Sequence, residues 1–282
     1  MCYNNTTITQ GIIMLKTILF ISTLILLNAC SNSNQDNTPY TKINSSTSWQ
    51  WQLKGEINTN HNVDLFDIDL FDTPLSTINN LHKKNKIVIC YFSAGSYEDW
   101  RADSSDFVDN TIGNTLDGWE DEKWLDIRTK SIREIMLHRL DLAKQKGCDG
   151  VEPDNVDGYV NNSGFKLTYN DQINYNIFLA KEAHSRGLSI GLKNDLNQIS
   201  ILEPHFDFAV NEQCYEYDEC ALLNPFSKNN KAIFNAEYNS SYIENLSNEQ
   251  TTVCNSSTIN KIQTLFLPID LDDTFRISCD NL

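Results

Sequence analysis

The sequence predicts an α/β fold of the (β/α)8, TIM-type barrel class, and three observations support this prediction. Eight short apolar segments are bounded by turn residues, which is typical of parallel strands buried on both faces. Helical patterns separate most of these segments. Polar side chains gather at the carboxyl-terminal ends of the segments, where barrel enzymes carry their chemistry. A doubly wound sheet is the alternative, but no G-x-G-x-x-G motif follows the first segment.

The predicted strands are residues 49–53, 63–70, 87–93, 150–154, 189–193, 208–212, 232–237 and 263–270. The clearest helix is predicted over residues 124–146, because apolar residues recur there at helical spacing and Gly147 follows as a stop signal. Further helices are expected at 74–84, 171–186, 199–204 and 243–248. The connection over residues 54–62 is too short for a helix.

The amino terminus has the pattern of an export signal. A short basic start at Met14 precedes an apolar run over residues 17–27, which is too short to span a bilayer but typical of a signal peptide. The run ends at Cys30 in a sequence that resembles the cleavage site of bacterial lipoproteins. We therefore expect residues 1–29 to be a signal peptide with its true start at Met14. An ordinary cleaved signal is the alternative.

The organisation that follows from this reading has three parts. Cys30 is expected to be lipidated and residues 30–48 to form a flexible linker. Residues 49–282 are then one barrel domain, anchored as a lipoprotein to the outer membrane or the cell surface. We expect the domain to act as a monomer.

The charge balance limits the class of partner. The chain carries a net charge of −16 and has an isoelectric point near 4.6, which argues against nucleic acid as a partner. An acidic cleft concentrates polycations, so a cationic polymer is the natural ligand. The alternative is that the surplus of acidic residues serves solubility.

Six cysteines remain after the signal peptide, and export makes disulfides permissible. Two disulfides are expected, Cys214–Cys220 across a short polar loop and Cys254–Cys279 near the carboxyl terminus. Cys90 lies in an apolar run, so we expect a reduced core thiol rather than a bridge to Cys148. There is no C-x-x-C spacing and the five histidines are scattered, so neither a structural metal site nor a cofactor is expected.

The stretch over residues 147–159 is the most informative one in the chain. Four carboxylates fall between Asp149 and Asp157, next to apolar residues that occur singly. We interpret residues 150–154 as a buried strand that carries Glu152 and Asp154 into an active site. Pro153 is expected to stop the strand from pairing further, and the turn at Asp157 and Gly158 leads into a loop.

The other strand ends follow the same pattern. They supply the acidic residues Asp69, Glu152, Asp154, Glu212, Glu237 and Asp270 with one basic residue, Lys193. A single one is more often a turn residue, but a coincidence at seven strand ends indicates a site. The pattern of a calcium-binding loop is absent, histidines for a transition metal are lacking, and there is no nucleophile elbow. Paired carboxylates remain, and these are the standard groups for glycoside cleavage.

Four motifs in order resemble glycoside hydrolase family 114, the endo-α-1,4-polygalactosaminidases. They are CYFSAGSYE at residues 90–98, VEPDNVD at 151–157, GLKND at 191–195 and NEQC at 211–214. The resemblance covers residues 49–273 and implies a (β/α)8 barrel that hydrolyses partly deacetylated α-1,4-linked N-acetylgalactosamine polymers. It places the catalytic pair at Asp154 and Glu212. Cys148 is a departure, because the family more usually has an aromatic residue there.

The resulting hypothesis is a retaining hydrolase in which Asp154 attacks the anomeric carbon and Glu212 acts as acid and then base. Retention requires the two carboxyl groups to be about 5–5.5 Å apart. The residues expected to bind substrate are Asp69, Tyr91, Glu152, Asp157, Tyr159, Lys193, Asn194, Glu237 and Asp270. Two alternatives stay open. One is a lyase that uses Lys193 as a Schiff base, and the other is a surface lipoprotein that binds cationic glycan without cutting it.

Overall fold

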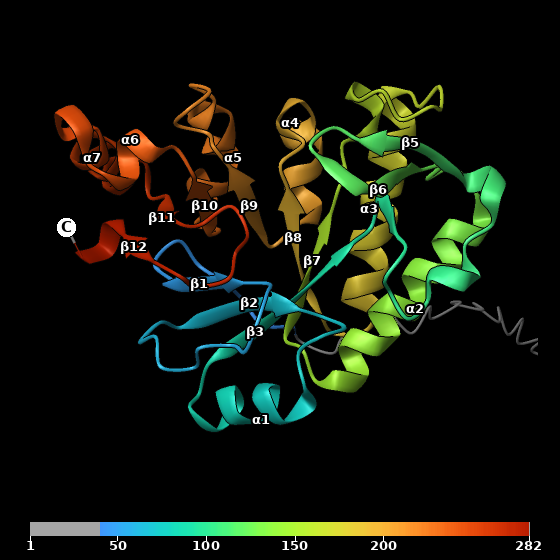
Figure 1. The fold of residues 1–282 in the computed structure, drawn as a ribbon, viewed down its shortest axis with the longest axis horizontal. Coiled ribbons are helices and arrows are strands. Elements are labelled where there is room, and N and C mark those ends of the chain that lie inside the picture. The colour runs from blue at the N-terminus through green and yellow to red at the C-terminus, as the bar shows by residue number, and fades with distance from the viewer. Residues whose placement is uncertain (1–39, 282) are drawn as a thin grey trace, which may run out of the picture. The chain divides into compact units, whose positions relative to one another are not determined.

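Eight parallel strands form the centre of the structure, a computed structural model that describes residues 40–281 (Figure 1). The strands are β1 (Trp49–Gln52), β2 (Leu65–Asp69), β3 (Ile87–Ser93), β7 (Gly150–Asp154), β8 (Ser189–Lys193), β9 (Phe208–Glu212), β10 (Ile233–Glu237) and β11 (Gln263–Phe266). Each pairs in parallel with the next one in chain order, and the sheet curls around a central core. All eight predicted strands are present. The last ends at Phe266, and β12 (Ile277–Ser278) pairs with it in the antiparallel direction.

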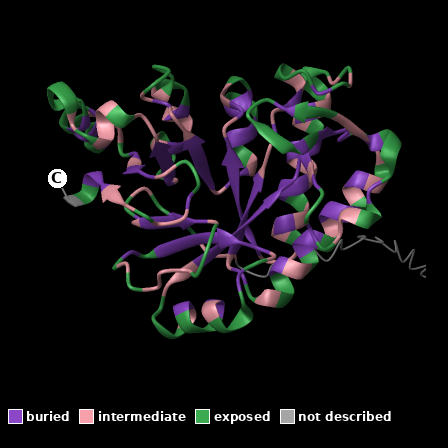
Figure 2. Ribbon diagram, viewed as in Figure 1, coloured by how far each residue is buried: buried purple, intermediate pink, exposed green. Residues whose placement is uncertain are grey.

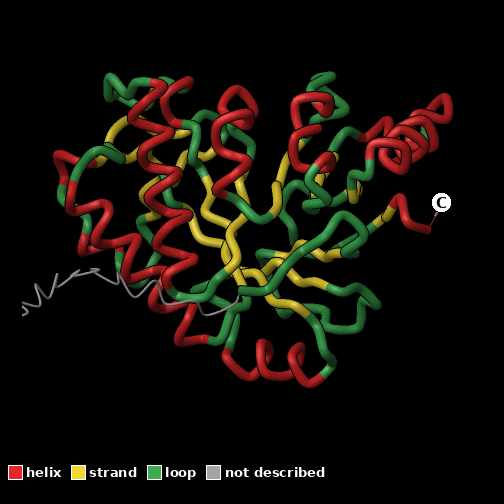
Figure 3. The backbone as a smooth tube through the Cα atoms, turned by 180° about the vertical axis from the view of Figure 1, so that it is seen from behind, coloured by secondary structure: helices red, strands yellow, loops and turns green. Residues whose placement is uncertain are grey.

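Helices follow six of the eight strands and lie outside the sheet (Figure 3). They are α1 (Leu75–Lys83), α2 (Lys130–Lys146), α3 (Tyr169–Ser185), α4 (Ile199–Leu202), α5 (Asn224–Lys228), α6 (Ser240–Ile243) and α7 (Glu249–Asn260). As predicted, no helix lies between β1 and β2. The helices α5 and α7 were not predicted. The fold is the expected (β/α)8 type.

The prediction of a helix over residues 124–146 is wrong in its first six residues. Trp124 and Leu125 belong to a strand, and α2 begins only after Thr129, whose hydroxyl accepts a hydrogen bond from the Ile132 amide. The helix ends as expected at Gly147, which has a left-handed backbone with φ of 84°. Apolar residues at the end of the preceding strand happen to continue the helical spacing, which is why the predicted helix begins too early.

That strand is part of an insertion between β3 and α2. The strands β4 (Ser96–Glu98), β6 (Trp119–Leu125) and β5 (Ile112–Leu116) form a small antiparallel sheet. A two-residue turn, Asp117-Gly118, joins β5 to β6, and Gly118 has the positive φ of 80° that such turns need. The insertion starts beside β7, where a Cβ on Gly95 would lie 1.7 Å from the carbonyl oxygen of Asn155. Only glycine fits there.

The strands separate two apolar cores because successive side chains of a strand point to opposite faces. One face fills the barrel interior with side chains such as Trp49, Trp51, Leu65, Phe208 and Phe234. The other face packs against the helices with side chains such as Phe66, Ile68, Phe92, Leu140 and Leu179. Figure 2 shows the central strands as buried and the outward helix faces as exposed. Charged residues on the inner face therefore have a cost unless they are paired.

The seam of the barrel lies between β1 and β11. Within residues 40–281 no backbone ladder joins these two strands. The Trp49 indole instead donates a hydrogen bond of 2.9 Å to the carbonyl of Gln263 on β11, and Arg276, just before β12, donates one of 2.8 Å to the carbonyl of Trp49. These contacts link the two edges of the curled sheet.

Residues 40–48 do not behave as the flexible linker expected from their composition. Ile43 is buried, Tyr40 stacks on His184 with ring centroids 4.4 Å apart, and Asn44 forms a β-bridge with Lys231. These residues belong to the barrel unit. The predicted signal peptide, the start at Met14 and the lipidation site Cys30 lie outside the described residues. Within residues 40–281 no helix is long and apolar enough to cross a membrane.

Three disulfides are present among the described residues. They are Cys214–Cys220, Cys254–Cys279 and Cys90–Cys148. The first two are the pairs expected from the sequence. The prediction that Cys90 is a reduced thiol is wrong, because Cys148 lies in the turn after α2 with its Cα 6.0 Å from that of Cys90. A bond between residues 58 positions apart depends on strand pairing, which spacing alone does not show.

Candidate active site

A cavity of 480 Å³ opens at the carboxyl-terminal ends of the strands. Asp154, Lys193 and Glu212 line it at the ends of β7, β8 and β9. A smaller hollow of 300 Å³ adjoins it and shares Glu212 with it, so the open space continues past this residue on a second side. The volume is in the usual range for sites that bind small ligands.

Lys193 is the centre of the charged groups. Its Nζ lies 3.1 Å from Oδ1 of Asp154, 3.2 Å from Oε2 of Glu212 and 3.4 Å from Oε1 of Glu152. It also lies 4.8 Å from the centre of the Trp51 ring. Burial disfavours the ammonium form, but the three carboxylates outweigh burial and raise the pKa of Lys193 well above its ordinary value. Lys193 is therefore a permanent cation.

The contacts of Lys193 limit the separation of Asp154 and Glu212. Oδ1 of Asp154 and Oε2 of Glu212 both lie within ion-pair distance of the Lys193 nitrogen. These two oxygens are therefore at most 6.3 Å apart (3.1 Å plus 3.2 Å). Both side chains are partly exposed and line the same cavity. The two acids therefore face one open space.

Asp154 is held by groups on both of its oxygens. The Tyr91 hydroxyl donates to Oδ2 at 2.9 Å, and the backbone amide of Asn155 donates to Oδ1 at 2.7 Å. Burial and the charge of Asp154 raise the pKa of Tyr91 well above its ordinary value, so the phenol keeps the proton that it donates. Hydrogen-bond donors thus fix both oxygens of Asp154 in place.

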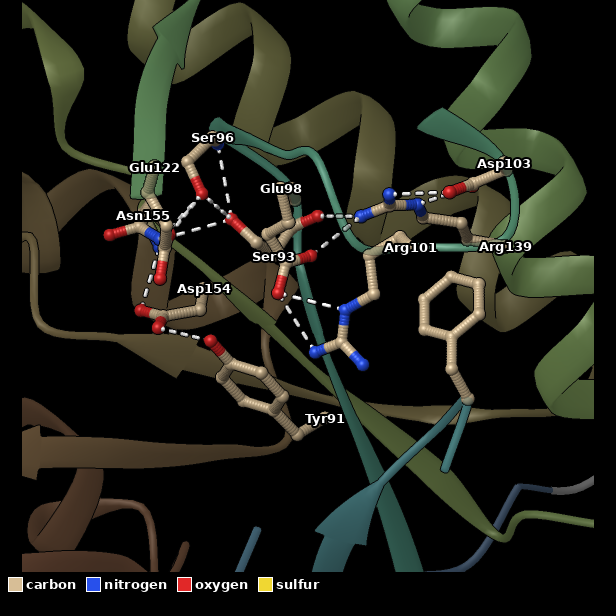
Figure 4. A network of polar contacts seen from close by, with 12 residues as sticks. Tyr91, Ser93, Ser96, Glu98, Arg101, Asp103, Glu122, Arg139, Asp154 and Asn155 are labelled. Carbon is tan, nitrogen blue, oxygen red and sulfur yellow. Dashed lines mark hydrogen bonds and ion pairs between the residues drawn. The ribbon is translucent and has the colours of Figure 1, made fainter. Parts of the chain in front are cut away.

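Asn155 is itself fixed by the insertion. Its side-chain amide donates to the hydroxyls of Ser93 and Ser96, and it lies 3.4 Å from Glu122 on β6. Figure 4 shows Ser96, Glu122 and Asn155 grouped beside Asp154, with Tyr91 on its other side. Burial raises the pKa of Glu122 to about 7. The small sheet thus supports the loop that follows β7.

Glu212 has a matching set of contacts. The Tyr238 hydroxyl donates to its Oε1 at 2.6 Å, and its backbone amide donates to the side-chain carbonyl of Asn194 at 3.0 Å. Residues with positive φ follow each of the three strand ends: Asn155, Asn194, Asp195 and Gln213. Such backbone conformations are costly for residues other than glycine and cluster at functional sites. They turn the chain sharply so that the acids stand at the cavity floor.

A family model for glycoside hydrolase family GH114 matches residues 30–282. The chain belongs to this family. Ega3 from Aspergillus fumigatus, solved as a complex with galactosamine, is 39% identical, with a TM-score of 0.80 over 86% of this chain and 98% of the Ega3 chain. The GH114 member is therefore a glycosidase, as the sequence motifs predicted.

The glycoside hydrolase domain of PelA from Pseudomonas aeruginosa shares the fold, with a TM-score of 0.64 and 12% identity over 82% of this chain and 98% of the PelA chain. A direct search with the sequence finds no match among proteins with curated descriptions. Like Ega3, the PelA domain is covered almost completely. The likeness therefore concerns the whole barrel and not a shared fragment.

Most of the residues expected in this GH114 site line the open space. Tyr91 and Asp154 line the cavity, and Tyr159 lines the smaller hollow. Three further expected residues line both spaces: Asp157, Asn194 and Glu212. Burial, together with the charge of Asp154, raises the pKa of Asp157 to about 6. These residues are brought together as predicted.

Four of the expected substrate-binding residues differ from these: Asp69 and Asp270 line the cavity but are already paired with basic side chains, whereas Glu152 and Glu237 do not line it. Asp69 forms a bidentate ion pair with Arg101, at 2.7 and 3.1 Å, and so is already neutralised. Glu237 lies on the outer face of β10, where it accepts a hydrogen bond from the Tyr215 amide. Asp270 stands on the exposed rim, 2.6 Å from Lys54. The fourth, Glu152, is completely buried below the cavity floor.

Several residues of the site were not predicted individually. They are Trp51, Asn155 and Glu122, all of which line the cavity. Tyr238, an aromatic residue at a strand end, lies two residues after the inward-facing Ala236 and contacts Glu212. Within residues 40–281 no three histidine, cysteine or acidic side chains are grouped so that they could hold a metal ion.

Proposed function

We propose that this protein hydrolyses α-1,4-linked galactosamine polymers within the chain, with retention of configuration. The observation that supports this best is the placement of Asp154 and Glu212 around Lys193. Oδ1 of Asp154 and Oε2 of Glu212 are at most 6.3 Å apart (3.1 Å plus 3.2 Å), which is below the roughly 6.5–9.5 Å that an inverting enzyme needs. The similarity to Ega3, whose structure contains galactosamine, supports the choice of sugar.

In the first step an oxygen of Asp154 forms a bond to the anomeric carbon while the bond to the leaving oxygen breaks. Glu212 gives its proton to that leaving oxygen. In the second step water attacks the same carbon, its proton passes to Glu212, and the ester bond to Asp154 breaks. The sum is the addition of one water across the glycosidic bond, and both carboxyl groups return to their starting state.

The charge of the cavity fits an amino sugar. Exposed or partly exposed acids such as Asp72, Asp117, Asp157 and Glu219 line the two hollows. Among the described residues, the basic side chains that line the two hollows are Lys54, Arg101 and Lys193. Each of them is already paired with a carboxylate. The net field is therefore negative, and it attracts the ammonium groups of deacetylated units.

The open space extends on both sides of the catalytic pair. Trp100 and Trp119, each about half exposed, line the larger cavity, and Tyr159 and Tyr217 line the smaller hollow. Aromatic faces at both ends suit a chain of sugar rings that passes through the site. Cleavage inside the chain follows from such a through-running cleft, whereas a closed end would favour release of single sugars.

Incubation of the purified protein with a galactosamine-rich polysaccharide tests the function. Mass spectrometry at early times is expected to show oligosaccharides of many lengths, and proton NMR is expected to show the α-anomer as the first product. A fully N-acetylated polymer is the matched control and is expected to be cut more slowly. Absence of products from both polymers would contradict the function, and release of the β-anomer would contradict retention.

Replacement of Trp119 by Ala is expected to raise KM for long polymers about tenfold, with little change in kcat. The reason is that loss of a stacking face removes about 1.4 kcal/mol of binding. Trp119 stands next to the Asp117-Gly118 turn, at the tip of the insertion. The matched variant Trp119→Phe keeps an aromatic face and is expected to restore most of the affinity. Equal KM values for all three proteins would exclude stacking at Trp119.

The lyase alternative requires Lys193 to be a neutral amine at the moment of attack. The three carboxylates within 3.4 Å keep it an ammonium ion, which has no free electron pair. Treatment with borohydride in the presence of substrate is therefore expected to leave Lys193 unmodified. A covalent adduct on this residue would favour the lyase.

A further inference from the structure

Two acids that the proposed mechanism does not use lie below the cavity floor. Asp67 on β2 and Glu152 on β7 are both fully buried, and neither lines the cavity. None of their four carboxylate oxygens has a hydrogen-bond partner elsewhere among the described residues. They flank β3, where Asp67 pairs with Ile89 and Glu152 pairs with Tyr91 two residues further along the strand, and each carboxyl group shifts the pKa of the other. A proton shared between the two would supply the missing hydrogen bond.

The charges around this pair are strongly unbalanced. Three carboxyl groups lie within 3.4 Å of the single cation Lys193, and a fourth, Asp67, also experiences its charge. Among the described residues, Lys193 is the basic side chain that forms ion pairs with members of this group. The other polar neighbours are the Tyr91 hydroxyl on Asp154 and the Tyr238 hydroxyl on Glu212, while the Trp51 ring and Asp157 complete the surroundings of Lys193.

Burial of several unpaired anions is costly, so some of these carboxyl groups must keep protons. Burial is the main cause that raises the pKa of both Asp67 and Glu152, and repulsion from Asp154 adds to it. Lys193 opposes the rise at both residues. One proton shared by the pair satisfies both tendencies, because it leaves a single negative charge beside Lys193.

The catalytic cycle moves a negative charge from one carboxyl group to the other. Before the first step Asp154 is ionised and Glu212 is protonated. After it, Asp154 is a neutral ester and Glu212 is a carboxylate. The Nζ of Lys193 lies 3.1 Å from the first group and 3.2 Å from the second, so it is paired with the charged one in either state. No movement of the lysine is needed.

We propose that Lys193 is the fixed counter-ion of the catalytic pair in both half-reactions, and that Asp67 and Glu152 share one proton and hold Lys193 midway as a single buried anion. The inference rests on the proposed roles of Asp154 and Glu212. Asp67 and Glu152 are positioning residues, since they act through Lys193. Their charge also offsets part of the lysine's field at the catalytic pair.

The test compares three variants by the pH dependence of kcat/KM on the galactosamine polymer. The double variant Asp67→Asn with Glu152→Gln removes the buried charge with little change in shape, so the remaining carboxyl groups ionise more easily. Both limbs of the profile are expected to move to lower pH by about one unit. Lys193→Met removes the cation and is expected to move the acid limb to higher pH, with a loss in kcat of about 10²–10³-fold.

Glu237→Gln is the matched control. Glu237 is also a fully buried carboxyl group at a strand end, but it lies on the outer face of β10. Its profile is expected to match that of the wild type. Thermal unfolding of each variant reports whether it folds, and if Lys193→Met does not fold, the double variant decides alone.

An unchanged profile for the folded double variant would overturn the inference, because it would mean that the pair carries no charge. A profile that shifts in all variants, including Glu237→Gln, would also overturn it, because the shift would then be a general effect of losing a buried acid. Failure of the wild type to cut any galactosamine polymer is a different result. It would overturn the proposed function itself.

Discussion

The variant Asp154→Asn is expected to cleave galactosamine polymers on the order of 10⁴-fold more slowly than the wild type. An amide in this place does not form the ester with the anomeric carbon, although it can still accept the hydrogen bond from Tyr91. Glu212→Gln removes the proton that the leaving oxygen needs and is expected to cost about 10²–10⁴-fold. Initial rates of reducing-end release, measured at saturating polymer, provide the comparison.

The control for both variants is Glu237→Gln, which changes a strand-end carboxyl group that does not face the cavity. Its rate is expected to stay within about twofold of the wild type. A folded Asp154→Asn protein that cuts as fast as the wild type would exclude Asp154 as the nucleophile. If neither the wild type nor the variant cuts while both bind the polymer, the non-catalytic binding role would be favoured instead.

The strands were predictable because parallel strands buried on both faces leave short apolar runs between turn residues. Residues 150–154 illustrate both the success and its limit. Pairing of β7 with β8 is confined to Gly150 and Val151, whereas pairing with β3 continues through Pro153 to Asp154. Proline has no backbone N–H, and the loss of this one hydrogen-bond donor affects pairing with only one of the two neighbouring strands. The sequence located the interruption but not the side of the strand on which it occurs.

The insertion was missed because its strands lack the usual apolar pattern. In β6, residues 119–121 and 123 are exposed and the inward positions include the polar Glu122 next to Trp124 and Leu125. A buried glutamate hides the alternation on which strand prediction depends. Glu122 is buried where it contacts Ser96 and Asn155 beside Asp154. The polar residue that supports the loop after β7 is thus the one that hides β6 from strand prediction.

The position of a residue at a strand end was a good guide to the site, but it does not give the face of the strand. Asp154, Lys193 and Glu212 point into the cavity, while Glu237 points outward because it follows the inward-facing Ala236. Asp69 does face inward, and its charge is taken up by Arg101 from the insertion. Such a partner depends on a loop whose path the sequence did not reveal.

The disulfide Cys90–Cys148 provides the second large expected effect. It closes a loop of 58 residues, and in the chain-entropy description such a crosslink stabilises the fold by about 4 kcal/mol. The double variant Cys90→Ala with Cys148→Ala is expected to lose about this much free energy of unfolding, measured by urea denaturation. The bond joins β3, which carries Tyr91, to the turn before β7, which carries Asp154, so it links two strands of the active site.

The pair Cys214–Cys220 is the internal reference for this measurement, because it closes a loop of only 6 residues. Its removal is expected to cost about 2 kcal/mol, roughly half as much. The order of the two losses is the decisive result, because both variants replace two cysteines by alanine and differ mainly in loop length. If the Cys90–Cys148 variant were as stable as the wild type, Cys90 would behave as the free core thiol that its apolar surroundings first indicated.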